Sequence, residues 1–169
     1  MEQTANKDKT DYKAELIKHG VIAFVPRGNS MWPTIKNGKQ SVIVKLKTEK
    51  LRPMDVALYQ RDNGANVLHR VIKTASFGYV ICGDSQFNCE KVREEQVYGV
   101  MAGFYRGKHY VDVNDADYIQ RVKKLYSSEK RRKFLVKTFF AFEYFKSLLK
   151  RVWHRLFGRK RTEKEDGND

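Results

Sequence analysis

The sequence predicts a mainly β domain, a coiled sheet or partial barrel, with a short helix before it and a long basic helical arm after it. Short segments rich in β-branched and aromatic residues recur at turn-sized intervals between residues 21 and 113, which is typical of small antiparallel sheets and barrels. Beyond residue 115 the apolar residues recur at steps of three and four, the period of an amphipathic helix. With 169 residues, the chain is long enough for one domain with its own core and one appendage.

We expect four parts in the chain. Residues 1–19 hold an N-terminal lead and a short helix that ends at Gly20, because glycine commonly follows the last turn of a helix. Residues 20–114 form the β domain, and residues 115–158 form the basic helical arm. Residues 159–169 are expected to be a disordered charged tail.

The predicted strands are short and are bounded by Gly, Pro or Asn-containing turns. A hairpin-type turn at residues 61–64 separates two of them. The seven predicted strands lie at residues 21–26, 41–46, 56–59, 67–72, 78–82, 97–105 and 110–113.

Two helices are predicted in the arm, and each has an apolar face. Ser127 and Ser128 separate them, since serine is a favoured N-cap that accepts a hydrogen bond from the first turn. The first face holds Tyr118, Val122, Leu125 and Tyr126. The second face holds Leu135, Phe139, Phe142, Phe145, Leu149, Val152 and Leu156, with a helix end at Gly158.

The formal net charge of +14 is concentrated in the arm. Residues 121–164 contain 16 Lys/Arg and 3 Asp/Glu, a balance that favours a phosphate-bearing partner. Three interpretations are open: residues 130–161 lie in the headgroup region of an anionic membrane, contact nucleic acid, or pack on the core or on a protein partner. The many aromatic residues exceed what a DNA-facing helix needs, which disfavours nucleic acid.

The sequence also predicts a compartment. No stretch approaches the roughly 18 uninterrupted apolar residues of a membrane-spanning helix, and residues 1–19 lack the apolar segment of a secretory signal. We therefore expect a cytoplasmic protein, peripheral on the inner face of the membrane if the arm binds lipid. Cys82 and Cys89 match no zinc-site spacing, so we expect reduced thiols, no metal and no other cofactor.

Three residues in separate segments suggest a catalytic site. Ser30 lies in a turn bounded by Gly28 and Pro33, and His69 lies inside a predicted strand. A serine hydroxyl attacks poorly at neutral pH unless a neighbouring base takes its proton, and histidine is suited to that task. Asp84 follows the next predicted strand. Taken singly, each has a structural interpretation as a turn serine, a core histidine or a turn aspartate.

Five segments, taken in order, resemble a known family. They are residues 28–35 (GNSMWPTI), 51–56 (LRPMDV), 67–72 (VLHRVI), 82–85 (CGDS) and 97–100 (VYGV). This set resembles the S24/S26 serine peptidases, the family that includes type I signal peptidases and the self-cleaving LexA-like repressors. The resemblance covers about residues 20–126 and implies the coiled β fold of that family.

The resemblance implies roles for the three candidate residues. Ser30 corresponds to the nucleophile, and its backbone N–H is the natural oxyanion donor. His69 stands where the histidine branch of the family has its general base. Asp84 either orients His69 or holds the site together. Glu90 is the nearest further acid, so a third catalytic member is left open.

Other residues of these segments are expected to shape the site. Arg70 is expected to be a structural ion-pair partner of Asp55 or Asp84. The residues of the nucleophile turn expected to shape it are Gly28, Asn29, Met31 and Pro33.

These observations together predict a serine endopeptidase with a Ser30/His69 dyad. The expected substrate is a peptide or preprotein, bound as an extended chain along a strand edge near Ser30. The alternative is a binding module without catalytic activity, which keeps the fold and attaches to a membrane or a protein partner through its arm.

Overall fold

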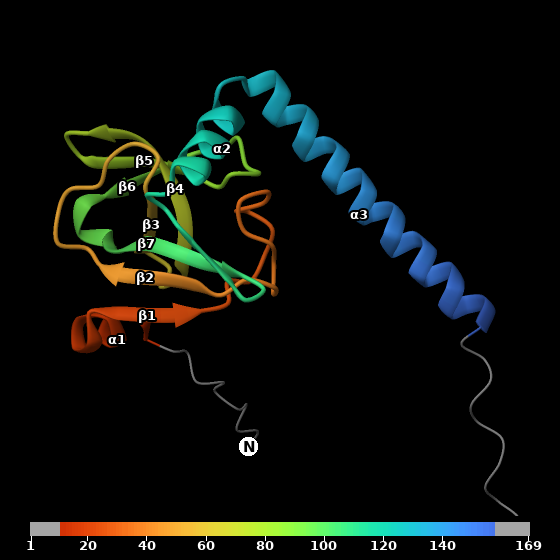
Figure 1. Cartoon of the computed structure of the whole chain (residues 1–169), viewed down its shortest axis with the longest axis horizontal. Coiled ribbons are helices and arrows are strands. Elements are labelled where there is room, and N and C mark those ends of the chain that lie inside the picture. The colour runs from red at the N-terminus through yellow and green to blue at the C-terminus, as the bar shows by residue number, and fades with distance from the viewer. Residues whose placement is uncertain (1–10, 158–169) are drawn as a thin grey trace, which may run out of the picture. The chain divides into compact units, whose positions relative to one another are not determined.

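The computed structural model describes residues 11–157, and its helices and strands are labelled in Figure 1. Three α-helices, one short 3-10 helix and eight strands follow one another in this range. Their bounds are α1 (Tyr12–His19), β1 (Val21–Phe24), β2 (Val42–Leu46), β3 (Val56–Gln60), β4 (Asn66–Ala75), β5 (Gly78–Cys82), β6 (Glu90–Arg93), η1 (Glu94–Gln96), β7 (Val97–Arg106), β8 (His109–Asp112), α2 (Ala116–Tyr126) and α3 (Glu129–Phe157).

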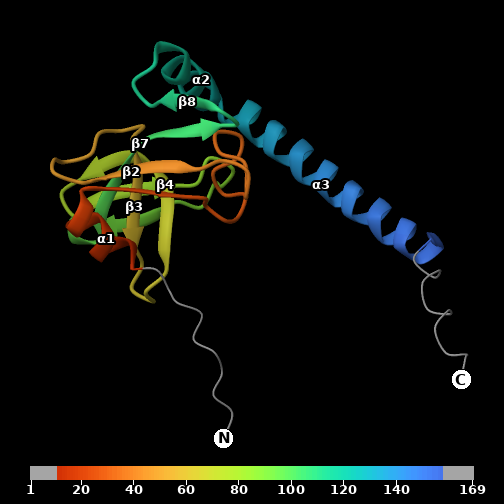
Figure 2. The same ribbon diagram turned by 60° about the horizontal axis from the view of Figure 1, so that its bottom comes forward.

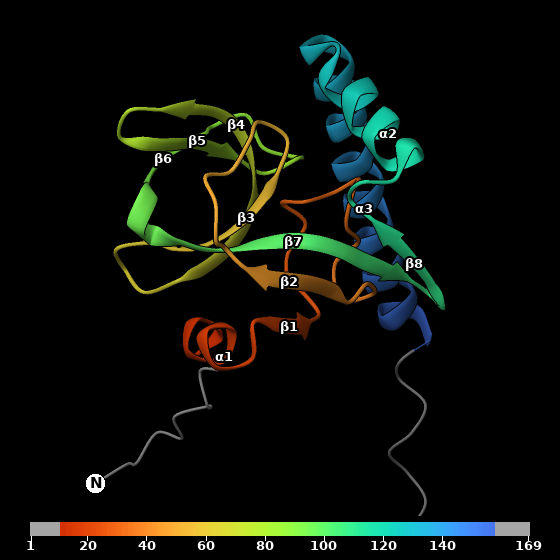
Figure 3. The ribbon, with the colours of Figure 1, turned by 60° about the vertical axis from the view of Figure 1, so that its left-hand side comes forward.

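The strands form one open antiparallel sheet, in the order β1-β2-β7-β3-β4-β5-β6, with β8 paired to β7. The long strand β7 pairs with β2, β3 and β8, so it joins the two parts of the sheet. Figure 3 shows the sheet curving around β7, and Figure 2 shows β8 beside that strand. The expectation of a β-sheet domain with a short N-terminal helix and a long C-terminal helix is confirmed. The sheet is not closed, and helices contribute enough that the chain is mixed α and β rather than mainly β.

Strand β6 (Glu90–Arg93) was not among the predicted strands. It pairs with β5, and only Val92 of its four residues is buried. A strand with charged residues at the other three positions has no apolar alternation, so it gives no periodic signal in the sequence. The first strand also ends at Phe24 and not at residue 26, because Pro26 has no N–H for the sheet.

Helix α1 ends at Gly20 as the sequence predicted, and Asp11 caps its first turn. The Asp11 side chain accepts hydrogen bonds from the amides of Lys13 and Ala14, both at 3.1 Å. Gly20 takes a left-handed conformation, with φ at 71°, which favours glycine. The buried Leu16 attaches the helix to the domain.

One cluster of the core consists of apolar and tyrosine side chains from β3, β4, β5, β6, β7 and the segment before β3. Its buried members are Leu51, Ala57, Tyr59, Val71, Tyr79, Ile81, Val92 and Val97. This core fixes the strands on which the candidate site residues lie.

The chain divides into two compact units between Lys124 and Leu125. In the second unit α3 begins after Ser128, whose hydroxyl accepts a hydrogen bond from the Arg131 amide at 3.3 Å. None of the helices within residues 11–157 is apolar over enough of its length to span a bilayer. The predicted lead before residue 11, the helix end at Gly158 and the predicted tail at residues 159–169 lie outside the described residues.

Candidate active site

Ser30 and His69 line the same cleft, which has a volume of about 440 Å³. They come from different parts of the fold, since Ser30 follows β1 and His69 lies in β4. Apolar side chains of the cleft include Leu68 and Met31, and a stacked pair of rings, Tyr12 and Phe24, also lines it, with ring centroids 4.6 Å apart. The fold thus brings the predicted nucleophile and the predicted base to one solvent-filled depression.

The turn that carries Ser30 is held by buried side chains and by hydrogen bonds within its own backbone. Met31 and Ile35 are buried residues of the turn itself, and the Ile35 amide donates to the Met31 carbonyl at 2.8 Å. The Trp32 amide donates to the Asn29 carbonyl at 3.0 Å, and the Trp32–Pro33 peptide bond is cis. The apolar anchors therefore leave Ser30 itself at the wall of the cleft.

The loop after β5 binds the backbone of the nucleophile turn. Ser85 donates twice to the Ser30 carbonyl, from its amide at 2.9 Å and from its hydroxyl at 3.1 Å. The same hydroxyl lies 2.8 Å from the Asn29 carbonyl. Among residues 11–157 no acceptor is bound by the Ser30 amide, which leaves that N–H available for a negatively charged oxygen in the cleft.

Gly83 allows this close approach. A Cβ atom at this position would lie 2.7 Å from the Ser30 carbonyl oxygen and 2.8 Å from the Gln86 amide oxygen. We expect Gly83→Ala to displace the turn that carries Ser30 and to lower, by about tenfold or more, the rate of the peptide cleavage that the family resemblance implies. The measurement is the kcat of the purified variant, with circular dichroism to check its fold.

Gly38→Ala is the matched control for that substitution. Gly38 lies just beyond the same turn, and a Cβ there would meet no atom within 4 Å. Its positive φ of 64° means that alanine adds backbone strain alone. A rate loss in Gly38→Ala as large as that in Gly83→Ala would contradict the steric explanation.

His69 and Arg70 are neighbours in β4 whose side chains serve different sites. Successive side chains of a strand point to opposite faces of the sheet. His69 lines the cleft, while Arg70 is wholly buried. His69 is itself only 3% exposed, so its ring has one restricted approach from the cleft.

Two side chains face the Nδ1 atom of His69. The Tyr59 hydroxyl lies 3.4 Å from this nitrogen, and the Glu90 Oε1 atom lies 3.7 Å from it. Glu90 is in turn held by Arg61, whose Nε donates to the carboxylate at 2.7 Å and whose Nη2 also binds it. A carboxylate at one ring nitrogen favours the tautomer that carries its proton there, which leaves Nε2 as the acceptor.

The electrostatics of this cluster keep the imidazole neutral and the carboxylate ionised. Burial lowers the pKa of His69 below its usual value, Glu90 opposes that shift, and the Arg61 cation adds to it. Hydrogen bonds from Arg61 lower the pKa of Glu90. Burial and the nearby Glu90 raise the pKa of Tyr59, so this hydroxyl keeps its proton. At neutral pH His69 is therefore in the form that a general base requires.

Asp84 and Arg70 form a buried ion pair beside the nucleophile turn. Arg70 Nε lies 2.7 Å from Oδ1 and Nη2 lies 2.8 Å from Oδ2, with both side chains fully buried. The Thr34 hydroxyl also donates to Asp84. Asp84 thus links β4 to the turn that carries Ser30, which fits the second of its two expected roles, holding the site together.

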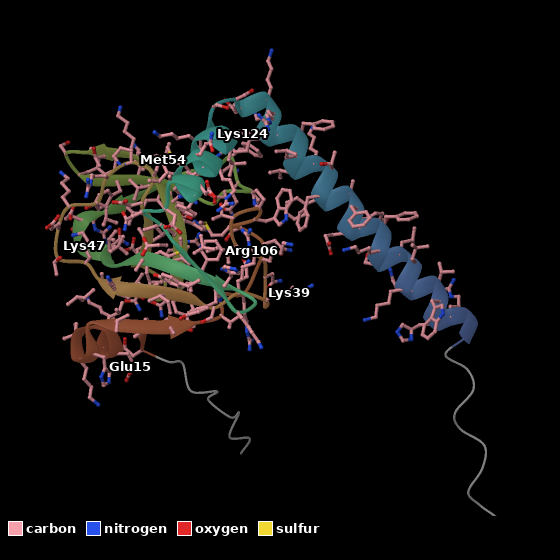
Figure 4. All side chains as sticks on the ribbon, in the orientation of Figure 1. Glu15, Lys39, Lys47, Met54, Arg106 and Lys124 are labelled. Carbon is pink, nitrogen blue, oxygen red and sulfur yellow. The ribbon has the colours of Figure 1, made fainter. Side chains whose placement is uncertain are left out.

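The remaining donors of Arg70 extend this network. Its Nη1 atom lies 2.8 Å from the Met54 carbonyl and 3.2 Å from the Tyr118 hydroxyl of α2. Met54, labelled in Figure 4, has a positive φ of 82°. Asp55, the other expected partner, instead accepts a hydrogen bond from the Arg52 amide at 2.7 Å. One arginine therefore joins β4 to the Asp84 loop, the Met54 segment and α2.

Four of the eight predicted site residues line the cleft. Ser30, His69, Gly28 and Met31 line it, and Asn29 and Pro33 belong to the turn that carries Ser30. The sequence left Glu90 open as a third catalytic member. Its Oε1 atom lies 3.7 Å from His69 Nδ1, and Glu90 belongs to β6, the strand that was not predicted. Tyr59 and Arg61 were not singled out in the sequence, and no local pattern around them marks a role.

The described part of the chain offers no metal site beside this cluster. No group of three or more His, Cys, Asp or Glu residues within it could hold a metal ion. Cys82 is buried, with its thiol donating to the Gln86 carbonyl at 3.3 Å, Cys89 is exposed, and the two form no disulfide.

No model of a protein family matches the chain, and no curated protein sequence matches it.

Proposed function

We propose that this protein is a serine endopeptidase of the S24/S26 type, with Ser30 as nucleophile and His69 as general base. One observation carries the proposal: Ser30 and a neutral, buried His69 line one cleft, and the Nδ1 side of that histidine faces a carboxylate. Two of the five sequence segments that resemble the family, residues 28–35 and 67–72, contribute side chains to this cleft. A serine, a base and a group that orients the base are the parts that covalent acyl transfer needs.

The proposed reaction has two halves. His69 Nε2 takes the proton of Ser30 Oγ as that oxygen bonds to the scissile carbonyl carbon, and the Ser30 N–H stabilises the oxyanion. The C–N bond then breaks, and His69 gives its proton to the leaving amine. Water attacks the acyl ester with His69 again as base, which releases the carboxylic acid and returns the proton to Ser30.

Glu90 supplies the orienting carboxylate in this scheme. Its position at Nδ1 stabilises both the required tautomer and the imidazolium that forms during attack. The hydrogen bonds from Arg61 keep Glu90 ionised and fixed. Asp84 acts indirectly, because Arg70 binds both of its carboxylate oxygens.

The proposed substrate is an extended peptide. Strand β1 pairs with β2 alone among the described strands and leads into the Ser30 turn. Its free edge can accept main-chain hydrogen bonds from a peptide strand laid toward Ser30. The apolar and aromatic lining of the cleft suits apolar side chains next to the scissile bond, and the family resemblance implies small ones.

A serine-reactive activity probe tests the proposal directly. We expect one covalent adduct per chain, mapped to Ser30 by peptide mass spectrometry, and weak labelling in His69→Ala because the serine then lacks its base. Equal labelling of the wild type, Ser30→Ala and His69→Ala would indicate a binding module without catalytic activity.

The pH dependence of kcat/KM provides a second test. Because the base must be unprotonated and burial lowers the pKa of His69, we expect the acid limb of the profile to lie below pH 6.5, the ordinary pKa of histidine. In Glu90→Gln the opposing charge is lost, so the limb should move to still lower pH while kcat falls. The measurement is a pH–rate profile of both proteins.

Glu95→Gln is the control for that profile. Glu95 lies in the adjacent 3-10 helix and pairs with Arg93 at 2.7 Å, away from His69. We expect its acid limb to coincide with that of the wild type. An acid limb that does not move in Glu90→Gln would show that Glu90 does not act on the histidine.

A further inference from the structure

Helix α3 presents an exposed apolar face along most of its length. Residues on this face lie three, four, seven or eight positions apart from Phe134 onward, and at 3.6 residues per turn they fall within an arc of about 140°. Each of these side chains is at least 40% exposed. The face consists of Phe134, Phe142, Phe145, Leu148, Leu149, Val152 and Trp153.

The rest of the helix surface is strongly cationic. Between residues 133 and 155 the helix has one acid, Glu143, and six exposed Lys/Arg residues. By helical geometry none of the six lies within the apolar arc, and three stand at its two margins. The six are Lys133, Lys137, Lys146, Lys150, Arg151 and Arg155, and Figure 4 shows side chains projecting along the whole helix.

We propose that α3 is an interfacial anchor, which lies in the plane of an anionic lipid surface with its apolar face among the acyl chains. An exposed Trp and three exposed Phe side chains on one face suit the boundary between headgroups and acyl chains. Lys and Arg side chains at the margins of the arc can extend their charged ends to lipid phosphates while their aliphatic parts remain among the acyl chains. Lys146 already has this arrangement, since its Nζ lies 4.5 Å from the Phe142 ring centroid.

The geometry indicates that the helix lies on the surface and does not cross it. Its 29 residues correspond to about 43 Å at 1.5 Å per residue, which exceeds a hydrocarbon core of about 30 Å. Lys/Arg residues are distributed over that whole length, so any crossing orientation would bury several of them. In the parallel orientation all of them remain at the headgroups.

Charge argues against a second copy of the chain as the occupant. Two α3 helices paired through this face would bring the cations at its margins close together, and like charges at such short range repel. These cations are Lys137, Lys146 and Arg155 of each helix. Between residues 133 and 155 each helix has one acid to offset them. In a coiled coil, the positions that flank the contact between two helices commonly carry opposite charges. In α3 these flanking positions hold Leu148 and Trp153 instead. A wide apolar face with purely positive margins complements an anionic bilayer instead.

Flotation of the full chain with lipid vesicles tests this proposal. We expect binding to vesicles of phosphatidylcholine with added phosphatidylglycerol, and little binding to phosphatidylcholine alone. Phe145→Asp places a charge in the middle of the apolar face and should weaken binding by about tenfold or more. The triple variant Lys146→Gln, Lys150→Gln, Arg151→Gln should weaken it by about tenfold or more as well, because each cation near the surface contributes.

Phe140→Asp is the matched control on the same helix. Phe140 is 45% exposed, comparable with the 54% of Phe145. Because the two residues are five positions apart, Phe140 points about 140° away from Phe145 around the helix axis, outside the apolar arc. Its vesicle affinity should stay within about twofold of the wild type. Ser30→Ala should float as the wild type does, so the result does not depend on the proposed peptidase activity.

Three outcomes would overturn the proposal. The first is equal binding to neutral and anionic vesicles, and the second is equal loss in Phe145→Asp and Phe140→Asp. The third is a wild-type protein that floats with neither vesicle and sediments as a dimer that Phe145→Asp dissociates, which would assign the face to a second copy of the chain.

Discussion

Replacing Ser30 with alanine is expected to lower the rate of peptide cleavage by about three orders of magnitude or more. The substitution removes the hydroxyl that stands at the end of the turn fixed by Met31, Ile35 and Ser85. The contacts that fix this turn use backbone atoms of Ser30 and not its hydroxyl. The folded state should therefore persist, and the loss should appear in kcat.

The measurement is a progress curve on a fluorogenic peptide, with a urea titration of both proteins. His69→Ala is expected to reduce kcat to a similar level, and the double variant should be no worse than either single one, because the two residues act in the same step. Cleavage by Ser30→Ala at the wild-type rate would exclude Ser30 as nucleophile. If Ser30→Ala were already unfolded in the absence of urea, its loss of rate would come from the lost fold and not from the missing nucleophile.

Replacing Asp84 with alanine is expected to destabilise the fold by about 3–5 kcal/mol, since it leaves a buried guanidinium without its carboxylate. Arg70 and Asp84 are fully buried and joined by two hydrogen bonds, at 2.7 and 2.8 Å. The Thr34 hydroxyl loses its acceptor at the same time. The measurement is the free energy of unfolding in urea at neutral pH, where the carboxylate is charged.

Asp62→Ala is the matched control, because Asp62 also pairs with an arginine. The Asp62–Arg93 pair has an N–O distance of 2.8 Å, but both side chains are more than half exposed. An exposed pair contributes little to stability, so this variant should unfold at nearly the wild-type urea concentration. If Asp84→Ala kept wild-type stability and lost only activity, Asp84 would act on catalysis directly and its structural assignment would be wrong.

Local patterns were sufficient for most of the secondary structure. The alternation of β-branched residues located seven of the eight strands, and Gly20 located the end of α1. Strand β6 escaped because its stability comes from hydrogen bonds to β5 and from one buried residue, Val92. A pairing partner in another segment leaves no trace in the periodicity of a four-residue strand.

The candidate site divides in the same way. Ser30 and His69 could be predicted, because a serine between Gly and Pro and a histidine within an apolar strand stand out from their neighbours. The position of Glu90 at His69 depends on β6 lying beside β5, and the role of Arg61 depends on the hairpin of β3 and β4. Such contacts arise between residues about 20 or more positions apart, so they follow from topology and not from local sequence.

The sequence by itself determined the two residue types of the proposed dyad, the strand-rich domain around them and the basic amphipathic arm, because each depends on neighbouring residues alone. Only the tertiary structure decided which acid serves which partner. Asp84 pairs with Arg70 in the buried network, and Glu90 faces His69. The physical reason is burial: a guanidinium with no solvent must be matched by a buried carboxylate, and which carboxylate reaches it is set by the packing of strands distant in the chain.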